Sequence, residues 1–120
     1  MWEIYKIGNL RGRDAVSIRE NGMLYFSSKL VRTISVSKND YPKFGILMFD
    51  SEAKMMGIKL SKEETSYSHP ISGTERDSGG WQMSCRSFIE HYQIKAKWYV
   101  ADYSEKDNTV RIYLKMALTG

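Results

Sequence analysis

The chain has 120 residues and a formal net charge of +4, with 42% hydrophobic and 27% charged residues, a composition typical of a globular protein. It excludes a disordered or fibrous chain and predicts one domain over residues 1–120. The longest uncharged apolar run, 44–49, is far shorter than the roughly 20 residues of a membrane-spanning helix, and the chain does not begin with a secretion leader, so we expect neither a membrane protein nor a secreted one.

Strand patterns open the chain. Aromatic and β-branched residues recur at period two over residues 2–7, which favours a strand. Two further strands are predicted over 15–20 and 23–26. Between them, Asn21 and Gly22 form the strongest hairpin signal in the chain, because both central residues of a two-residue type I′ turn need a positive φ. The sequence therefore predicts that these two strands pair directly.

A short amphipathic helix is predicted next. Ser27 or Ser28 can cap its first turn by accepting a hydrogen bond from a free backbone N–H group. The apolar face consists of Leu30, Val31 and Ile34. Pro42 disfavours helical backbone at the residue before it, so the helix ends before that point. Strands over 43–50 and 54–60 follow, joined as a second hairpin.

The second half begins with a polar segment. Residues 61–80 are rich in serine, glycine and charged side chains, with Ile71 as the one aliphatic residue, so a long surface loop is predicted. The elements expected beyond it are a short strand at 81–83, a helix starting at Ser84 with Phe88, Ile89 and Tyr92 on its apolar face, and strands at 97–103 and 109–118.

The two halves share an order of features: a glycine turn, a short apolar strand, a serine, a short helix and a hairpin. We interpret this order as an internal duplication, with repeat 1 at about 15–60, the polar loop at 61–80 and repeat 2 at about 80–116. Any hairpin, helix and hairpin arrangement would produce a similar pattern, which is the alternative. A unit of about 40 residues is too small to bury its own core. The expected fold is therefore mostly β (α+β) and barrel-like, with two pseudo-symmetric units sharing one core.

Residues 16–60 resemble the looped-hinge-helix unit of the AbrB/SpoVT family of transcription regulators. The features in common are the hairpin Gly22, the apolar strand at 23–26, the aliphatic helix positions and Asn39-Asp40 after the helix. This chain has Met23 where the family usually has a basic residue. The resemblance implies a swapped-hairpin barrel and DNA binding, with both units here in one chain.

Basic residues are concentrated in the first half. Residues 1–60 contain ten Lys and Arg against six Asp and Glu, whereas residues 61–120 contain eight of each. The candidate nucleic-acid-binding residues are Arg11, Arg13, Arg19, Lys29 and Arg32. Such a surface could neutralise backbone phosphates, although a solvated surface of mixed charge is the plain alternative. Trp81 and Trp98 are expected in the core.

Catalytic and metal-binding signatures are weak. Cys85 and His91 are six residues apart along the same predicted helix, so they point in different directions. No CxxC or HxxxH spacing indicates a zinc site, and no cofactor is expected. A single cysteine fits a reducing compartment, so the cytoplasm is the expected location.

The sequence thus predicts a non-enzymatic nucleic-acid-binding protein, a DNA-binding regulator that contacts duplex DNA as a monomer or homodimer. The alternative is a protein-interaction module, such as a phage inhibitor or accessory factor, that docks through the 61–80 loop or an exposed strand edge. Titration with duplex DNA at two salt concentrations tests the first hypothesis, and a pull-down with nuclease treatment discriminates the second from it.

Overall fold

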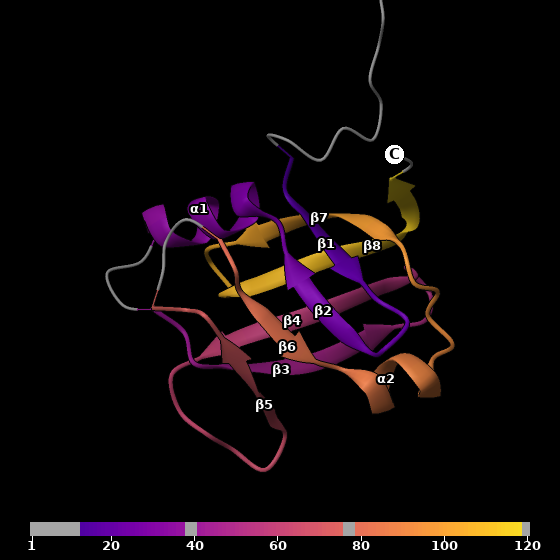
Figure 1. Ribbon diagram of the computed structural model, residues 1–120, viewed down its shortest axis with the longest axis horizontal. Coiled ribbons are helices and arrows are strands. Elements are labelled where there is room, and N and C mark those ends of the chain that lie inside the picture. The colour runs from indigo at the N-terminus through magenta and orange to yellow at the C-terminus, as the bar shows by residue number, and fades with distance from the viewer. Residues whose placement is uncertain (1–12, 38–40, 76–78, 119–120) are drawn as a thin grey trace, which may run out of the picture.

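Eight antiparallel strands close into a barrel in the computed structural model, which describes residues 13–37, 41–75 and 79–118 (Figure 1). The strands are β1 (Ala15–Ile18), β2 (Met23–Phe26), β3 (Phe44–Asp50), β4 (Met55–Ser61), β5 (Ser68–Ser72), β6 (Gln82–Ser84), β7 (Trp98–Ser104) and β8 (Thr109–Leu118). The two helices are α1 (Ser28–Ser37) and α2 (Arg86–His91). The mostly β, barrel-like fold expected from the sequence is confirmed. The strand predicted at 2–7 lies outside the described residues.

The order of strands around the barrel is β1-β2-β6-β5-β3-β4-β8-β7. Each strand pairs with its hairpin partner on one side, and the hairpins alternate between the two halves of the chain. The four contacts between hairpins are β2–β6, β5–β3, β4–β8 and β7–β1, and every one of them joins the first half to the second. If each of β1 to β4 is exchanged with the strand four numbers later in the sequence (β1 with β5, β2 with β6 and so on), the order around the barrel stays the same, as a duplication requires. The duplication itself stays a prediction.

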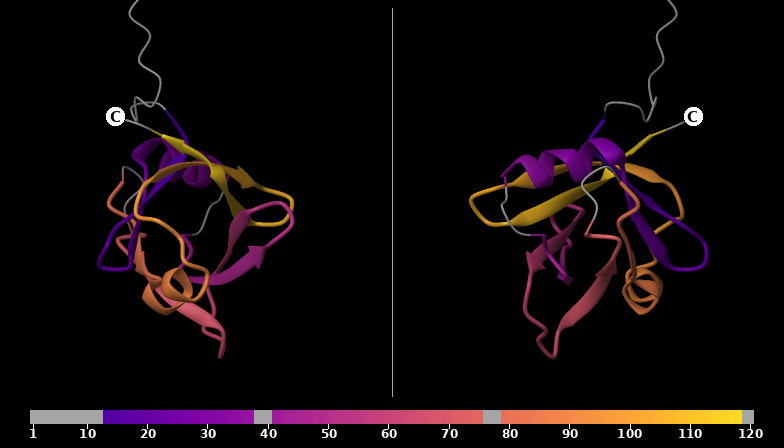
Figure 2. Two further views of the ribbon diagram at one scale, coloured as in Figure 1. Left: turned by 90° about the vertical axis from the view of Figure 1, so that its right-hand side faces the viewer. Right: turned by 60° about the vertical axis from the view of Figure 1, so that its left-hand side comes forward.

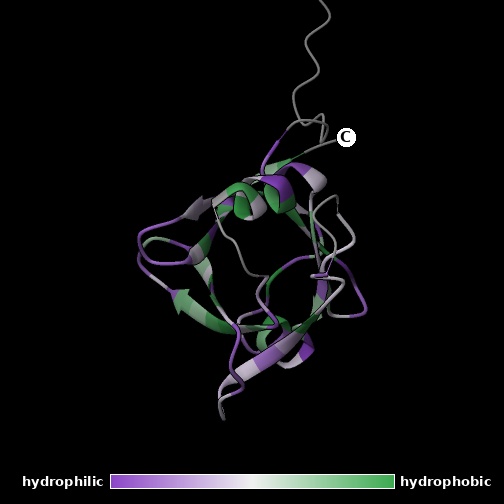
Figure 3. Ribbon diagram, turned by 90° about the vertical axis from the view of Figure 1, so that its left-hand side faces the viewer, coloured by the Kyte–Doolittle hydropathy of each residue, from purple (hydrophilic) through white to green (hydrophobic). Residues whose placement is uncertain are grey.

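Antiparallel pairing defines two ends of the barrel. One end, called here the α1 end, contains the start of β1, the end of β2 and α1. The other, called the α2 end, contains the turn between β1 and β2 together with α2. In both views of Figure 2 the two helices lie on opposite sides of the barrel. In Figure 3 the barrel is seen as a ring, and α1 along its upper rim has both hydrophobic and hydrophilic residues.

The core is formed by the inward residues of the strands and by both helices. In α1, Leu30, Val31 and Ile34 are fully buried, as the helical periodicity predicts, and α1 packs against β1 and β7. Trp81 is fully buried and meets Phe26 edge to face, with 5.9 Å between ring centroids. The expectation that Trp81 is a core residue is confirmed.

The turn between β1 and β2 differs from the predicted one. Strands 15–18 and 23–26 do pair, but Asn21 does not have a positive φ, whereas Gly22 has a φ of 85°. The Arg19 N–H donates to the Met23 carbonyl, and the Gly22 N–H donates to the Arg19 carbonyl. These hydrogen bonds define a three-residue loop over residues 20–22 that ends in a glycine with a left-handed backbone. Loops of this type are, after the two-residue ones, among the commonest connections in β-hairpins. Only the glycine of the Asn-Gly pair was correctly interpreted.

The segment 61–80 is not a loop throughout, because β5 lies within it. Ile71 is its buried residue, while Pro70 and Ser72 are exposed. Pairing between β5 and β6 begins at Ile71. Pro70 therefore lies just before the paired stretch, where its missing N–H costs no hydrogen bond to β6. With one buried residue among five, β5 has too weak an alternation to be recognised from sequence. Since β5 is the hairpin partner of β6, the proposed second repeat at 80–116 omits a strand.

The other elements follow the sequence closely. The hairpins β3–β4 and β7–β8 are confirmed, and each has a four-residue loop whose last residue has a positive φ, Lys54 at 55° and Asn108 at 54°. The helix α2 begins two residues later than predicted. Ser84 is an exposed strand residue, and the N-cap is Cys85, which makes no side-chain capping hydrogen bond.

Candidate nucleic-acid-binding surface

The predicted basic residues lie at both ends of β1. Arg13 precedes the strand at the α1 end, where its carbonyl oxygen accepts a hydrogen bond from the Ser27 hydroxyl. Lys29 and Arg32 are exposed on α1, at the same end. Arg19 follows β1 at the α2 end, and the four residues of the strand span about 13 Å at ~3.3 Å per residue. The four described residues therefore form two groups rather than one. Arg11 lies outside the described residues.

Arg19 is held over the outer face of the β1–β2 hairpin. Its guanidinium carbon lies 4.8 Å from the centroid of the Tyr25 ring, and its Nε donates a hydrogen bond of 2.8 Å to the Ser17 hydroxyl. Both contacts fix the side chain, because a cation over an aromatic face is attracted by the ring quadrupole. Arg19 makes no ion pair within the described part of the chain. Its charge is thus positioned and remains available to an anionic ligand.

Two more basic residues, Lys97 and Arg86, have their backbone beside this turn, and a third, Lys95, is near Lys97 in sequence. The Ile18 N–H donates to the Lys97 carbonyl at 2.9 Å, which places Lys97 beside the end of β1. Lys95 is two residues earlier, and both lysines are exposed. Arg86 lies against Gly22 and pairs with Glu90 one helical turn further along, at 3.1 Å.

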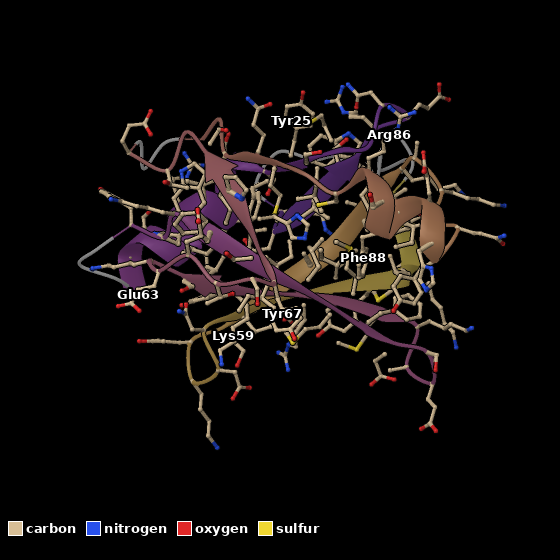
Figure 4. The ribbon with its side chains drawn as sticks, turned by 90° about the horizontal axis from the view of Figure 1, so that it is seen from below. Tyr25, Lys59, Glu63, Tyr67, Arg86 and Phe88 are labelled. Carbon is tan, nitrogen blue, oxygen red and sulfur yellow. The ribbon has the colours of Figure 1, made fainter. Side chains whose placement is uncertain are left out.

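Gly22 allows the turn to approach α2 closely. A Cβ at this position would lie 2.5 Å from the Cβ of Arg86, closer than real Cβ contacts occur. The Cys85 N–H also donates to the Gly22 carbonyl at 2.9 Å. This contact brings Arg86, which is far away in sequence, next to the β1–β2 turn. Figure 4 shows Tyr25 and Arg86 along the same edge of the molecule.

An outward row of residues crosses the barrel wall beside this turn. Strand registers place Trp98 opposite Ser17, Ser17 opposite Tyr25, and Tyr25 opposite Gln82. Trp98 is only half-buried and does not belong to the core, so the expectation of a core tryptophan is wrong at this position. Its side chain is outward because Tyr99, the next residue, is the buried one. We call this region the hairpin surface; its members are Arg19, Tyr25, Gln82, Arg86, Lys95, Lys97 and Trp98.

Sequence reasoning found Arg19 in this surface and missed Arg86, Lys95 and Lys97. The second half has no excess of basic residues, so counting charge by halves directed attention away from it. A usable signal was present, however. The segment Lys95-Ala96-Lys97 places two lysines immediately before an alternating strand that begins with an aromatic residue.

A second charged cluster lies on the outer face of β7 and β8. Asp102 accepts two hydrogen bonds from Arg111, at 2.7 and 3.1 Å, and one from the Tyr113 hydroxyl at 2.6 Å. The hydrogen bond to Asp102 raises the pKa of Arg111, and it likewise raises the pKa of Tyr113. The charge of Arg111 is thus already paired, in contrast to the charge of Arg19.

An open cavity of about 650 Å³ lies at the α1 end. Its lining includes Lys43, Lys62, Thr74, Glu75 and the ring of Tyr41. Both signs of charge occur together with hydroxyl groups. This mixture does not single out one chemical class of ligand.

Cys85 lacks the character of a nucleophile. The thiol is buried, and desolvation raises its pKa from the ordinary value of 9.0 to about 12. A protonated thiol reacts poorly, since the thiolate is the nucleophile and the metal ligand. Among the described residues, no group of three His, Cys, Asp or Glu side chains is placed to hold a metal ion. Within the same residues, no helix has both the length and the apolar character needed to cross a membrane.

Comparisons with known proteins find no matching family model, no matching curated protein and no matching solved structure.

Proposed function

We propose that this protein is a non-enzymatic nucleic-acid-binding protein that contacts the phosphate backbone through the hairpin surface. The observation that carries the proposal is the oriented charge of Arg19, which is unpaired among the described residues. The backbone of Lys97 lies beside the end of β1, and Arg86, which is paired with Glu90, lies beside Gly22. Lysine and arginine side chains that neutralise phosphates release counterions, and this release drives binding that is independent of sequence. A role as a DNA-binding regulator, which the AbrB/SpoVT resemblance implies, is the finer part of the proposal.

The test is a titration of labelled DNA, followed by fluorescence anisotropy, at two salt concentrations. The double variant Lys95→Ala/Lys97→Ala removes two exposed charges that have no partner in the described part of the chain. We expect weaker binding to every DNA sequence and a salt dependence reduced by about one unit of log–log slope per lost phosphate contact.

A matched control is Lys59→Ala/Lys106→Ala. Lys59 is exposed on the outside of β4, and Lys106 is exposed in the loop after β7 at the α1 end. This variant has the same net charge as the first one, so it separates a local contact from a general electrostatic effect. Equal losses in the two variants, or no binding of the unaltered protein at low salt, would refute the proposal.

The pair Lys29→Ala/Arg32→Ala tests the other group of predicted residues. Both side chains are exposed on α1, at the end of the barrel opposite to Arg19. If this variant alone loses affinity, the nucleic acid binds at the α1 end and the hairpin surface is the wrong site.

The second candidate function is binding of a protein partner. Each of the eight described strands has two neighbours, but the pairing is incomplete: β5 pairs only with residues 44–46 of β3, and β4 pairs only with residues 109–113 of β8, so short strand edges remain for docking. The polar segment remains a candidate, because Tyr67 is 77% exposed between β4 and β5. In Figure 4 Tyr67 is labelled near the middle of the view, apart from Tyr25 at the upper edge. Capture of a partner that survives nuclease treatment and is lost with Tyr67→Ser would favour this candidate over the first.

A further inference from the structure

The hairpin surface contains aromatic side chains that the barrel does not use for its core. Tyr25 and Trp98 are both half-buried, and neither belongs to the core cluster or packs against it. Two aromatic residues nearby point inward and are buried: Phe26, at the end of β2, and Trp81, directly before β6. The rings of Tyr25 and Trp98 therefore lie on the outer face of the barrel, partly covered and partly accessible to a ligand.

The strand registers fix how these rings are arranged. Ser17 is paired with Trp98 on one side and with Tyr25 on the other, so the two aromatic residues are two strands apart in one outward row. Two strand spacings of ~4.8 Å separate them by about 10 Å. The Ser17 hydroxyl is buried beneath Arg19, so the Arg19 side chain occupies the space between the two rings. A flat ligand group would therefore stack on the guanidinium of Arg19 above Tyr25, or on the ring of Trp98.

Basic groups adjoin this row. The guanidinium of Arg19 lies over the ring of Tyr25, and planar guanidinium groups are themselves stacking partners for bases. Lys97 immediately precedes Trp98, and Arg86 lies at the turn. On the far side of Tyr25, the amide of Gln82 offers a donor and an acceptor for the edge of a base.

Unpaired bases fit this arrangement better than a duplex does. In a duplex the faces of the bases are stacked on one another and only their edges are accessible, so outward rings on a strand have nothing to stack on. In single strands the faces are free, and aromatic side chains beside a basic groove bind them with little dependence on sequence.

We propose that the ligand is single-stranded nucleic acid, bound across the outside of β7, β1, β2 and β6 with its bases on Trp98 and on the Arg19–Tyr25 pair. This inference rests on the proposed nucleic-acid-binding function and names its substrate class. The basic residues around the turn contact the phosphates, and the rings receive the bases.

The test compares a labelled 20-nucleotide oligo(dT) with a labelled 20-base-pair duplex, again by fluorescence anisotropy. We expect the single strand to bind at least tenfold more tightly. Removal of a ring, in Trp98→Ala or Tyr25→Ala, should weaken binding of the single strand by about tenfold or more and leave binding of the duplex unchanged. Trp98→Phe and Tyr25→Phe keep a ring and should keep most of the affinity.

Tyr67→Ala is the matched control, since it removes an exposed tyrosine outside the hairpin surface. Circular dichroism of each variant verifies that it is folded. Equal affinity for both ligands, with no effect of the two ring deletions, would overturn this inference while the proposed function stands. Binding of neither ligand would overturn both.

Discussion

The two ends of the barrel are closed by helices of different depth. At the α1 end, a ten-residue helix places Leu30, Val31 and Ile34 fully inside the core. At the α2 end, a six-residue helix places only Ile89 there. Because buried apolar area is the main source of stability, the α1 end contributes more of it. Two segments with the same order of hairpin, helix and hairpin can therefore cover the ends of a barrel with helices that bury different amounts of apolar surface.

The helices also begin differently. The Ser27 hydroxyl accepts hydrogen bonds from the Ala15 and Leu30 N–H groups, both at 3.1 Å, and donates one to Arg13. It therefore connects the start of α1 to the start of β1. The helix α2 has no such cap. It is held instead at its C-terminal end, where the ring of its C-cap residue Tyr92 stacks on the ring of Phe49 from β3, with 4.0 Å between the ring centroids. A local signal specifies the first helix, whereas tertiary packing specifies the second.

The largest expected effect is a cavity at the α1 end. Leu30→Ala removes a fully buried side chain and should lower the free energy of unfolding by about 3 kcal/mol or more. Ile89→Ala, at the shallower end, should cost about 2 kcal/mol, since Ile89 is partly accessible and its surroundings can relax. Urea denaturation followed by circular dichroism measures both. A larger loss for Ile89→Ala would reverse the comparison.

The next effect concerns the contact between the β1–β2 turn and α2. Gly22→Ala introduces a Cβ 2.5 Å from Arg86 at a φ of 85°, so it should cost about 2 kcal/mol of stability. Gly57→Ala is the matched control. Its Cβ would be 3.2 Å from the end of the flexible Met48 side chain, and its cost should stay below ~1 kcal/mol. Thermal unfolding of both variants measures the difference. Equal unfolding midpoints for the two variants would contradict the close contact between Gly22 and Arg86.

Smaller effects should separate the two helix starts. Ser27→Ala removes the cap of α1 and leaves two backbone N–H groups without this acceptor, at a cost of about 1–2 kcal/mol. Ser84→Ala removes the residue that the sequence predicts as the start of α2. It should change stability by less than ~0.5 kcal/mol, because Ser84 is exposed and lies in β6. A comparable loss for Ser84→Ala would mean that Ser84 caps α2 after all.

The smallest effect is the pH dependence due to Cys85. Burial raises the pKa of its thiol from 9.0 to about 12, so the folded state retains the proton when the unfolded state loses it. Stability from this source is complete below pH 9 and is lost between pH 9 and 12, with ~0.8 kcal/mol lost at pH 9.5. Cys85→Ala should remove that slope. Parallel pH profiles of the two proteins would show that the thiol is not buried.

How much of this could be predicted depends on where each signal lies. The helix start, expected at Ser27 or Ser28 and observed at Ser27, the hairpins with polar loops and the buried face of α1 are encoded within a few neighbouring residues, and the structure confirms them. The expected barrel with two short helices rests on the interpretation of an internal duplication, which stays a prediction. The strand β5 was missed because Ile71 alone marks its inward face. Periodicity needs more than one buried residue before it can be recognised.

The candidate site was harder to predict, since it depends on residues brought together by folding. Lys97 is beside Ile18, and Arg86 is beside Gly22, through contacts that join distant parts of the chain. Trp98 was assigned to the core because aromatic strand residues are commonly buried. Whether its ring points inward depends on the register of β7, which the sequence does not reveal without the burial of Tyr99.

The alternation of hairpins from the two halves has a consequence for the cleaved protein. A single cut by a protease in the exposed segment between β4 and β5 would break no strand pairing, and the resulting fragments would remain joined along all four contacts between hairpins. Neither fragment retains two neighbouring hairpins, so neither should fold by itself. Mixed together, the two pieces should reconstitute the closed barrel by complementation.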